Sequence, residues 1–170
     1  FVLPGDELFI ASQEKKLHRN FQGYCTRRTT GQVYAFGVTG ISQLAGCYSQ
    51  NGKNIPAYIN LINEGQLPVL KGYILNEEER VTREVISTLM CNHMVVWNEI
   101  AKDLCLNVDE VKQVLNYDEC SLIDLAGDGI IEFDAESIRV LPEAVPFVRN
   151  VAASLDKLMK SSDKKFSKAL

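Results

Sequence analysis

Residues 76–105 read NEEERVTREVISTLMCNHMVVWNEIAKDLC, and this stretch decides the fold of the second half of the chain. Asn76 and Glu79 have the spacing of a capping box, which predicts that a helix begins there. Apolar residues then recur every three or four positions, as on the buried face of a helix, at Val81, Val85, Ile86, Leu89 and Met90. The same spacing returns at Trp97, Ile100, Ala101, Leu104 and Cys105. The stretch therefore predicts two consecutive helices that share one apolar core.

The residues that follow predict a third helix, a β-hairpin and a closing helix. Asn107 and Glu110 repeat the capping-box spacing. Two runs of β-forming residues flank a turn at residues 134–136, which is the pattern of a hairpin. Pro142 suits the first turn of the closing helix, because proline is tolerated at that position. We therefore expect a winged-helix-like domain over residues 72–170.

Residues 1–71 have a less regular pattern. Asp6 can cap a helix that we expect over residues 5–18, and residues 33–38 predict a β-strand. A short helix is expected over residues 55–64, and the other segments read as turns. These residues lack the pattern of a complete domain, so we interpret them as the end of a preceding one. The expected fold class is α+β and mostly helical.

The composition indicates a folded globular protein. Of the 170 residues, 46% are apolar and 24% are charged, values that argue against disorder. No apolar run approaches the roughly 20 residues of a membrane helix, so we expect no membrane association. The net charge of −4 argues against a nucleic-acid partner, because phosphate binding needs a basic field. The opening Phe1-Val2-Leu3-Pro4 has no initiator Met and no signal-like segment, so the chain reads as part of something longer or as a processed product.

Cysteine and histidine positions predict no metal site and no catalytic residue. The five cysteines are far apart and form no CxxC pair. We expect reduced thiols in a cytoplasmic protein, with Cys91, Cys105 and Cys120 buried among apolar helical residues. His18 and His93 have no carboxylate or thiol at ligand spacing, which favours packing or surface roles.

An alternative function is a binding or regulatory module, because a winged helix can place its third helix in a DNA major groove. Here Lys112 stands against a row of carboxylates in that region, Asp109, Glu110, Asp118, Glu119 and Asp124. The turn of the expected hairpin is acidic as well. Such a face repels phosphate, so the sequence disfavours DNA binding.

A series of short segments carries a resemblance to a known family. HRNFQGY at residues 18–24, GVTGIS at 37–42 and CYSQN at 47–51 resemble the oxygen-independent coproporphyrinogen III oxidases. These are radical S-adenosylmethionine enzymes of haem synthesis. The resemblance continues through KGYIL at 71–75 and FSK at 166–168, so it covers nearly the whole chain.

The resemblance implies a domain arrangement. The family has a radical S-adenosylmethionine barrel followed by a largely helical domain. Residues 1–71 are thus similar to the C-terminal end of the barrel domain and a connector, and residues 72–170 to the complete C-terminal domain. The family's CxxxCxxC motif and glycine-rich segment are absent from this sequence. The [4Fe–4S] cluster and S-adenosylmethionine are therefore expected in the full-length parent, and this fragment alone is expected to bind neither and to be inactive.

The resemblance also implies the reaction. The family oxidatively decarboxylates two propionates of coproporphyrinogen III to vinyl groups, giving protoporphyrinogen IX, by 5′-deoxyadenosyl radical chemistry. The implied partners are this substrate and the chain's own N-terminal radical domain. The expected role of this part is to cover the active site and complete the cofactor pocket. Relatives that handle haem are an alternative within the family, and residues 18–24 and Phe166 favour the oxidase.

Three residues are candidates for cofactor binding. Phe21 and Gln22 resemble the family's Phe-Gln pair beside S-adenosylmethionine, and Ile41 matches an isoleucine that contacts this cofactor. From the residues alone, Ile41 reads equally as a core residue at a strand end, and Gln22 as a turn residue. The sequence departs from the family pattern nearby: Ala35 stands where glycine is common, and Thr39-Gly40 replaces a Ser-Ala-like pair.

Two further expectations concern partners. Arg19, Arg27 and Arg28 can meet the propionates of the substrate, since arginine binds carboxylates through two parallel hydrogen bonds. A solvated polar loop is the simpler interpretation of these arginines. The strand expected over residues 33–38 would present an open edge in a fragment, which predicts self-association there.

Overall fold

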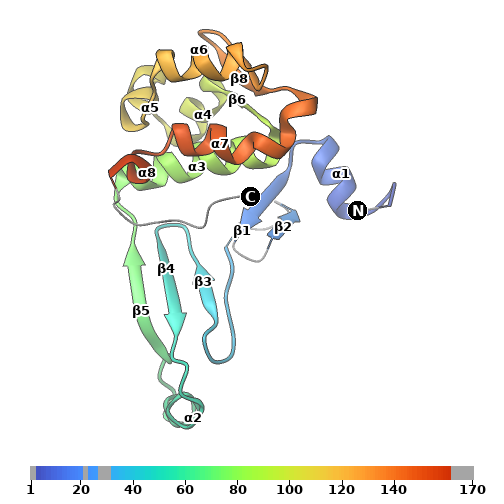
Figure 1. Cartoon of the computed structure of the whole chain (residues 1–170). Coiled ribbons are helices and arrows are strands. Elements are labelled where there is room, and N and C mark those ends of the chain that lie inside the picture. The colour runs from blue at the N-terminus through green and yellow to red at the C-terminus, as the bar shows by residue number, and fades with distance from the viewer. Residues whose placement is uncertain (1–2, 21–22, 27–31, 162–170) are drawn as a thin grey trace. The chain divides into compact units, whose positions relative to one another are not determined.

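The structure is a computed structural model, and it describes residues 3–20, 23–26 and 32–161. The chain divides into two compact units, Phe1–Arg80 and Val81–Leu170. Figure 1 shows the elements of both units. Within the described residues, no helix has the length and apolar character needed to cross a membrane.

The second unit combines helices with a small antiparallel sheet. Its helices are α3 (Glu77–Asn92, which begins in the first unit), α4 (Trp97–Leu104), α5 (Val108–Val114), α6 (Glu119–Gly127), the 3₁₀ helix η1 (Pro142–Phe147), α7 (Val148–Ser154) and α8 (Lys157–Ser161). Its strands are β6 (Met94–Val96), β7 (Ile131–Phe133) and β8 (Ser137–Val140), in the order β6-β8-β7. The hairpin β7–β8 confirms the sequence prediction. Strand β6 was not predicted, because a run of three residues between two helices has no detectable period.

One apolar core fills the second unit. The predicted helical faces supply much of it, since Val81, Val85, Leu89 and Met90 of α3 are buried. Trp97 of α4 is 0% exposed, which confirms its predicted place in the core. The rest of the cluster comes from all the other elements up to α7, at Val95, Ile100, Ala101, Val111, Leu115, Leu122, Ile131, Ile138, Val140, Ala144, Val148, Val151, Ala152 and Leu155. Full burial of a large apolar side chain contributes about 1.5–3 kcal/mol, so this core is the main source of the unit's stability.

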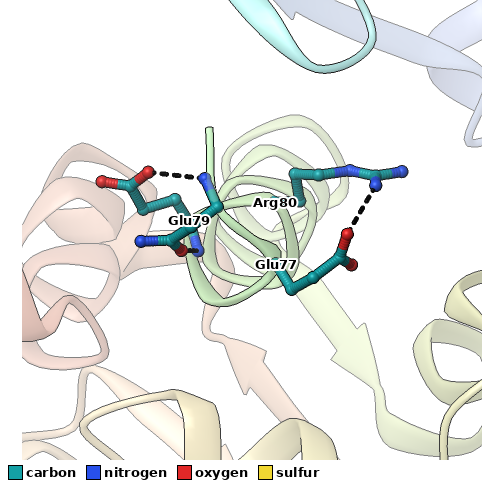
Figure 2. Close-up of polar contacts among 4 residues, drawn as sticks. Glu77, Glu79 and Arg80 are labelled. Atoms are coloured by element: carbon teal, nitrogen blue, oxygen red, sulfur yellow. Dashed lines mark hydrogen bonds and ion pairs between the residues drawn. The ribbon is translucent and has the colours of Figure 1, made fainter. Parts of the chain in front are cut away.

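Both predicted capping boxes form. At the start of α3, the Glu79 N–H donates to Asn76 Oδ1 at 2.8 Å, and the Asn76 N–H donates to Glu79 Oε2 at 2.9 Å. Figure 2 shows Glu79 reaching back in this way, and Arg80 paired with Glu77. The Tyr73 hydroxyl also donates to the Glu79 carboxylate. This bond and the bond from the Asn76 N–H both lower the pKa of the Glu79 carboxyl.

The second box is at α5, where the Glu110 N–H and Asn107 Oδ1 lie 2.8 Å apart and the Asn107 N–H and Glu110 Oε2 also lie 2.8 Å apart. Each box satisfies two N–H groups that a helix otherwise leaves without a partner.

The predicted third helix is two helices, α5 and α6. The sequence pattern favours one helix that ends at Gly127, but α5 ends at Val114 and α6 begins at Glu119. Asn116 explains the break: its N–H donates to Leu155 O at 3.0 Å, and its side chain donates to Ser154 O at 2.8 Å. Contacts with a segment far along the chain thus override local helix propensity.

Within its described residues, the first unit contains two small antiparallel sheets and two helices before α3. Its elements are α1 (Glu7–Gln13), β1 (Leu17–Asn20), β2 (Gly23–Thr26), β3 (Ile41–Gln43), β4 (Cys47–Asn51), α2 (Ile55–Asn63) and β5 (Val69–Ile74). Strands β1 and β2 form a hairpin, and the other sheet has the order β3-β4-β5. Figure 1 shows α2 at the end of this sheet, in the connection from β4 to β5.

Several sequence predictions for the first unit are wrong. The helix expected over residues 5–18 ends at Gln13, because Lys15 adopts a left-handed conformation with φ 55° and the following residues pair in β1. The strand expected over residues 33–38 does not form. Val33 makes an isolated bridge with Gln43, and the residues after it form a loop.

The turn expected at residues 50–52 is instead the end of β4, with a shift in its register to β5 between Gln50 and Asn51. Strand pairing decides these segments, and single-sequence patterns do not encode it. By contrast, the helix expected over residues 55–64 is confirmed as α2, with Asn54 as its cap.

The first unit has little core of its own. Among its described residues, only Ala11, Gln43, Asn51 and Pro68 are buried. Many large apolar side chains are exposed instead, namely Leu3, Ile10, Tyr24, Tyr34, Phe36, Ile55, Ile59, Ile62, Leu67, Val69, Leu70, Tyr73 and Ile74. An 80-residue unit that buries so little apolar surface lacks the usual source of independent stability.

The cysteines are all free thiols. Cys91 is buried as predicted, whereas Cys105 and Cys120 are exposed, which corrects the expectation for those two. Cys105 directly follows α4 in a left-handed conformation, and Cys120 lies in the first turn of α6. Both positions lie at helix ends, where an apolar pattern alone predicts burial poorly.

Candidate functional site

The candidate site contains the loop of residues 35–40, which leads into β3 and the predicted cofactor residue Ile41, and several hydrogen bonds hold this loop. The buried Asn51 side chain donates to Gly37 O at 2.9 Å and to Ala35 O at 3.4 Å. The Asn51 N–H donates to Gly40 O at 2.9 Å. One residue of β4 therefore fixes both ends of the loop.

A second clamp comes from α2. The Tyr58 hydroxyl accepts a hydrogen bond from the Gly37 N–H at 3.0 Å. Gly37 has φ 92°, a conformation that favours glycine. Helix α2 and Asn51 thus hold the two peptide groups on either side of the Gly37 Cα. The loop has one defined conformation that presents Phe36 outward, 91% exposed.

Packing within the loop explains the departures from the family pattern. A Cβ added at Gly40 would lie 3.0 Å from Cβ of Ala35 and 3.2 Å from the carbonyl oxygens of Phe36 and Gly37. Carbon atoms at 3.0 Å overlap, so these two positions cannot both carry a side chain without a shift. The resemblance implies glycine at the first position and an alanine-like residue at the second, and this chain has the reverse order. Exchanging the two residues together avoids the contact between the two Cβ atoms, while the contacts with the carbonyl oxygens remain.

Ile41, a predicted cofactor residue, is the first residue of β3. It is half-buried and pairs with Gln50 of β4. The neighbouring peptide groups of Gly37 and Gly40 already take part in hydrogen bonds within the loop. Any contribution of this position to an adenine-like ligand would therefore come from apolar contact by the Ile41 side chain.

Phe21 and Gln22, the other predicted cofactor residues, lie outside the described residues. The residues that flank them form the ends of β1 and β2. The Gly23 N–H donates to Asn20 Oδ1 at 3.2 Å, which holds the two strand ends together. The structure therefore defines the backbone of the hairpin on either side of the predicted pair.

The described residues gather no set of metal ligands, and two of their titratable groups have shifted pKa values caused by burial. Burial raises the pKa of the Cys25 thiol, which keeps it protonated and poorly nucleophilic. Burial also lowers the pKa of His93, whose backbone carbonyl accepts from the Val140 N–H. No three His, Cys, Asp or Glu residues within the described part of the chain gather as metal ligands would.

Sequence reasoning missed Asn51 and Tyr58, the residues that hold the loop. Asn51 falls in a Gln-Asn-Gly segment that is typical of a turn, and Tyr58 lies in a helix where no local pattern marks it as functional. Both act on a loop that is distant in the sequence. Only the pairing of β3 with β4 and the placement of α2 bring them to it.

Curated relatives match the whole chain. It is 34% identical over 173 residues to the oxygen-independent coproporphyrinogen III oxidase of Synechocystis, an alignment that covers 100% of this chain and 37% of the relative. It is 33% identical to the Escherichia coli protein of the same name, with 92% of this chain and 33% of the relative covered. The protein of that name from Thermostichus vulcanus is 33% identical, with 100% and 52% covered.

A solved structure is similar as well. It is described as coproporphyrinogen III oxidase from Escherichia coli, a radical SAM enzyme, and it matches with a TM-score of 0.79 at 32% identity. The match covers 93% of this chain and 36% of that chain. No family model matches the sequence. The chain spans between a third and about half of the length of these relatives.

Proposed function

Since this chain is homologous over its whole length to oxygen-independent coproporphyrinogen III oxidases, we propose that it is the C-terminal part of such an enzyme, converting two propionates of coproporphyrinogen III to vinyl groups. The observation that carries the proposal is the match of both sequence and fold, at 30–34% identity and a TM-score of 0.79. Similarity of both sequence and fold over nearly the whole of this chain supports a shared reaction better than a shared fold alone does.

The proposed parent uses S-adenosylmethionine and a [4Fe–4S] cluster, which together supply a 5′-deoxyadenosyl radical when bound. We assign the cluster to the part of the parent outside this chain, because the described residues gather no set of ligands for it. The contribution of this chain is the edge of the cofactor pocket, where Ile41 offers an apolar contact from a loop that Asn51 and Tyr58 hold in place.

The proposed division of labour follows the two parts of the sequence. Residues 1–71 would complete the barrel domain, and residues 72–170 would form a winged-helix-like domain that shields the pocket from solvent. The order α3, β6, α4, α5–α6, β7, β8 and the sheet order β6-β8-β7 support the winged-helix interpretation. The acidic side chains in α5 and α6 support the view that this domain does not bind DNA.

The exposed apolar residues of the first unit support its packing against the rest of the parent. On α2, Ile55, Ile59 and Ile62 recur every three or four residues, so they form one apolar stripe, and all three are exposed. An apolar stripe of this kind is typical of a surface that another part of the protein covers. We propose that the N-terminal radical domain of the parent covers it.

The edge of the sheet in the first unit supports self-association of the isolated chain. The strand expected over residues 33–38 does not provide the open edge, because it does not form. Strand β5 does: it lies at the edge of its sheet, and its residues Val69–Ile74 are exposed. An exposed apolar edge strand pairs readily with another chain.

Five free thiols are compatible with the reducing cytoplasm, where we place the parent.

The test is to determine the DNA sequence upstream of this segment and to express the complete reading frame anaerobically. We expect a CxxxCxxC motif upstream. We also expect purified protein to convert coproporphyrinogen III to protoporphyrinogen IX while it forms 5′-deoxyadenosine. The 170-residue chain alone should do neither. A complete frame without that motif, or a reconstituted protein that cleaves S-adenosylmethionine but leaves coproporphyrinogen III unchanged, would contradict the proposal.

A further inference from the structure

The hairpin β1–β2 carries an arginine, Arg19, that has no counter-ion among the described residues. Arg19 is half-buried, and its guanidinium carbon lies 5.8 Å from the centre of the Tyr24 ring. The two residues are direct partners in the strand register, so they lie on the same face of the hairpin. Among the described residues, no carboxylate forms an ion pair with Arg19. A half-buried cation held on a ring, with no acid beside it, is arranged to bind an anion from outside.

The surrounding sequence has the same character. Residues 15–63 contain six basic side chains and no acidic one, although the chain as a whole has a net charge of −4. The acidic residues gather elsewhere: residues 99–136 contain eleven carboxylates and two lysines. The first unit thus offers a positive stretch of 49 residues, and Arg19 is a basic side chain in it that lies over an aromatic ring. Segregation of this kind attracts anions to one part of a protein.

From this arrangement we infer that Arg19 binds a carboxylate of the substrate, with Tyr24 holding the guanidinium in place. The inference rests on the proposed function, and it adds a binding residue and the chemical group that the residue recognises. Coproporphyrinogen III carries four propionates, which are carboxylates on flexible arms. Arginine is suited to them because its planar group offers two parallel N–H donors to one carboxylate.

The tyrosine contributes preorganisation. A guanidinium stacked on a ring gains about 0.5–1 kcal/mol at an exposed site, and it loses less rotational freedom when it binds. The hairpin itself is held by the bond from the Gly23 N–H to Asn20 Oδ1, so the strand that carries Arg19 has a fixed end. Arg19 therefore combines a fixed backbone, an aromatic support and a charge without an ion-pair partner among the described residues. An arginine in a solvated polar loop would lack the first two.

S-adenosylmethionine also has a carboxylate, so the test separates the two sources. The experiment uses the full-length enzyme and three variants: Arg19→Gln, Arg19→Lys and the control Lys53→Gln. Lys53 lies in the same acid-free stretch and is exposed, so its change removes one charge without touching the hairpin. Binding of coproporphyrin III, the stable oxidised form of the substrate, is followed by its fluorescence, and the KM values for coproporphyrinogen III and S-adenosylmethionine are measured separately.

We expect Arg19→Gln to weaken coproporphyrin binding about ten-fold or more, as for the loss of a charged hydrogen-bonded pair, and to raise the KM for coproporphyrinogen III similarly. Arg19→Lys should recover only part of this, because lysine lacks the paired donors. Lys53→Gln should leave binding unchanged. The tetramethyl ester of coproporphyrin, which has no carboxylate, should bind the wild type and Arg19→Gln equally.

Three results would overturn the inference. They are equal weakening by Arg19→Gln and Lys53→Gln, an increase in the KM for S-adenosylmethionine alone, and no change in either KM. Each presupposes a wild-type enzyme that converts coproporphyrinogen III. A wild type that cleaves S-adenosylmethionine but neither binds coproporphyrin nor converts the substrate contradicts the proposed function itself, so the two failures are distinguishable.

Discussion

The unit Val81–Leu170 buries its apolar side chains in one continuous core, whereas the unit Phe1–Arg80 leaves most of its large apolar side chains exposed. The second unit is therefore built as an independent domain. The first holds its form by polar means: strand pairing, the Asn51 and Tyr58 clamps on one loop, and helix caps. The difference supports the proposal that another part of the parent completes the first unit and covers its apolar surface.

The largest expected effect separates the two units by core truncation. Leu89→Ala removes a side chain that is 0% exposed in the second unit, and we expect a loss of about 3–5 kcal/mol in the free energy of unfolding. Leu70→Ala in β5 is the matched control, since Leu70 is 70% exposed, and it should change stability in the isolated chain by less than about 0.5 kcal/mol.

Denaturant unfolding followed by the fluorescence of Trp97, the single tryptophan, measures the second unit directly. In the full-length enzyme, Leu70→Ala should also become destabilising, because the proposed N-terminal radical domain would then cover β5. An equal effect of Leu70→Ala in both contexts would remove the distinction between the units.

The second expected effect tests the polar construction of the first unit. Gly40→Ala introduces a Cβ 3.0 Å from Cβ of Ala35, and such overpacking costs about 1–3 kcal/mol. The double variant Ala35→Gly with Gly40→Ala should recover part of the loss, because it removes the contact between the two Cβ atoms and leaves those with the carbonyl oxygens of Phe36 and Gly37. Hydrogen exchange of the Thr39 and Asn51 amides, which bond across this loop, provides the measurement. A double variant as unstable as Gly40→Ala alone would show that the two positions do not compensate.

A smaller effect compares caps. Asn107→Ala breaks the capping box of α5 in the second unit and should cost about 1 kcal/mol. Asn107→Asp keeps a capping oxygen and is the control that should retain most of the stability. Urea unfolding followed by circular dichroism gives both values. Equal losses for the two variants would indicate that the Asn107 side chain has a role other than capping.

The smallest effect is a pH dependence of the second unit. Burial lowers the pKa of His93 from its ordinary value of 6.5, so the unfolded chain binds a proton more readily than the folded one. Stability should therefore decrease as the pH falls below 6.5 towards the lower pKa of the folded state. His93→Gln should remove this component in denaturant titrations between pH 7.5 and about 5. A wild type and variant with the same pH profile would assign the dependence to other groups.

The same division decides how much could be predicted from sequence. In the second unit, the capping boxes at Asn76 and Asn107, the apolar faces and the hairpin are local patterns, and the structure confirms them. In the first unit, the sheet β3-β4-β5 depends on pairing between distant segments, and the predictions for residues 33–38 and 50–52 are wrong. In the second unit, the prediction of one continuous third helix is wrong for the same reason. The helix breaks near Asn116, whose hydrogen-bond partners are 38 or more residues away in the sequence.

The candidate site follows this rule. Ile41 was identified through resemblance, and its local environment required the structure, because Asn51 and Tyr58 reach the neighbouring loop only through the fold. The support of Arg19 by Tyr24 depends on a strand register that places the two residues opposite each other, and the sequence alone left that arginine as part of a polar loop.

The contact between Ala35 and Gly40 also constrains the history of the loop. The order of small residues that the resemblance implies for the family and the reverse order in this chain are separated by two substitutions, and the two substitutions can occur in either sequence. One route passes through two alanines, whose Cβ atoms would overlap at 3.0 Å. The other passes through two glycines, which leaves space and costs only backbone entropy. Inheritance of the reversed pair is thus expected to run through the double-glycine ancestor, so at this loop the order in which mutations arise is set by the distance between two carbon atoms.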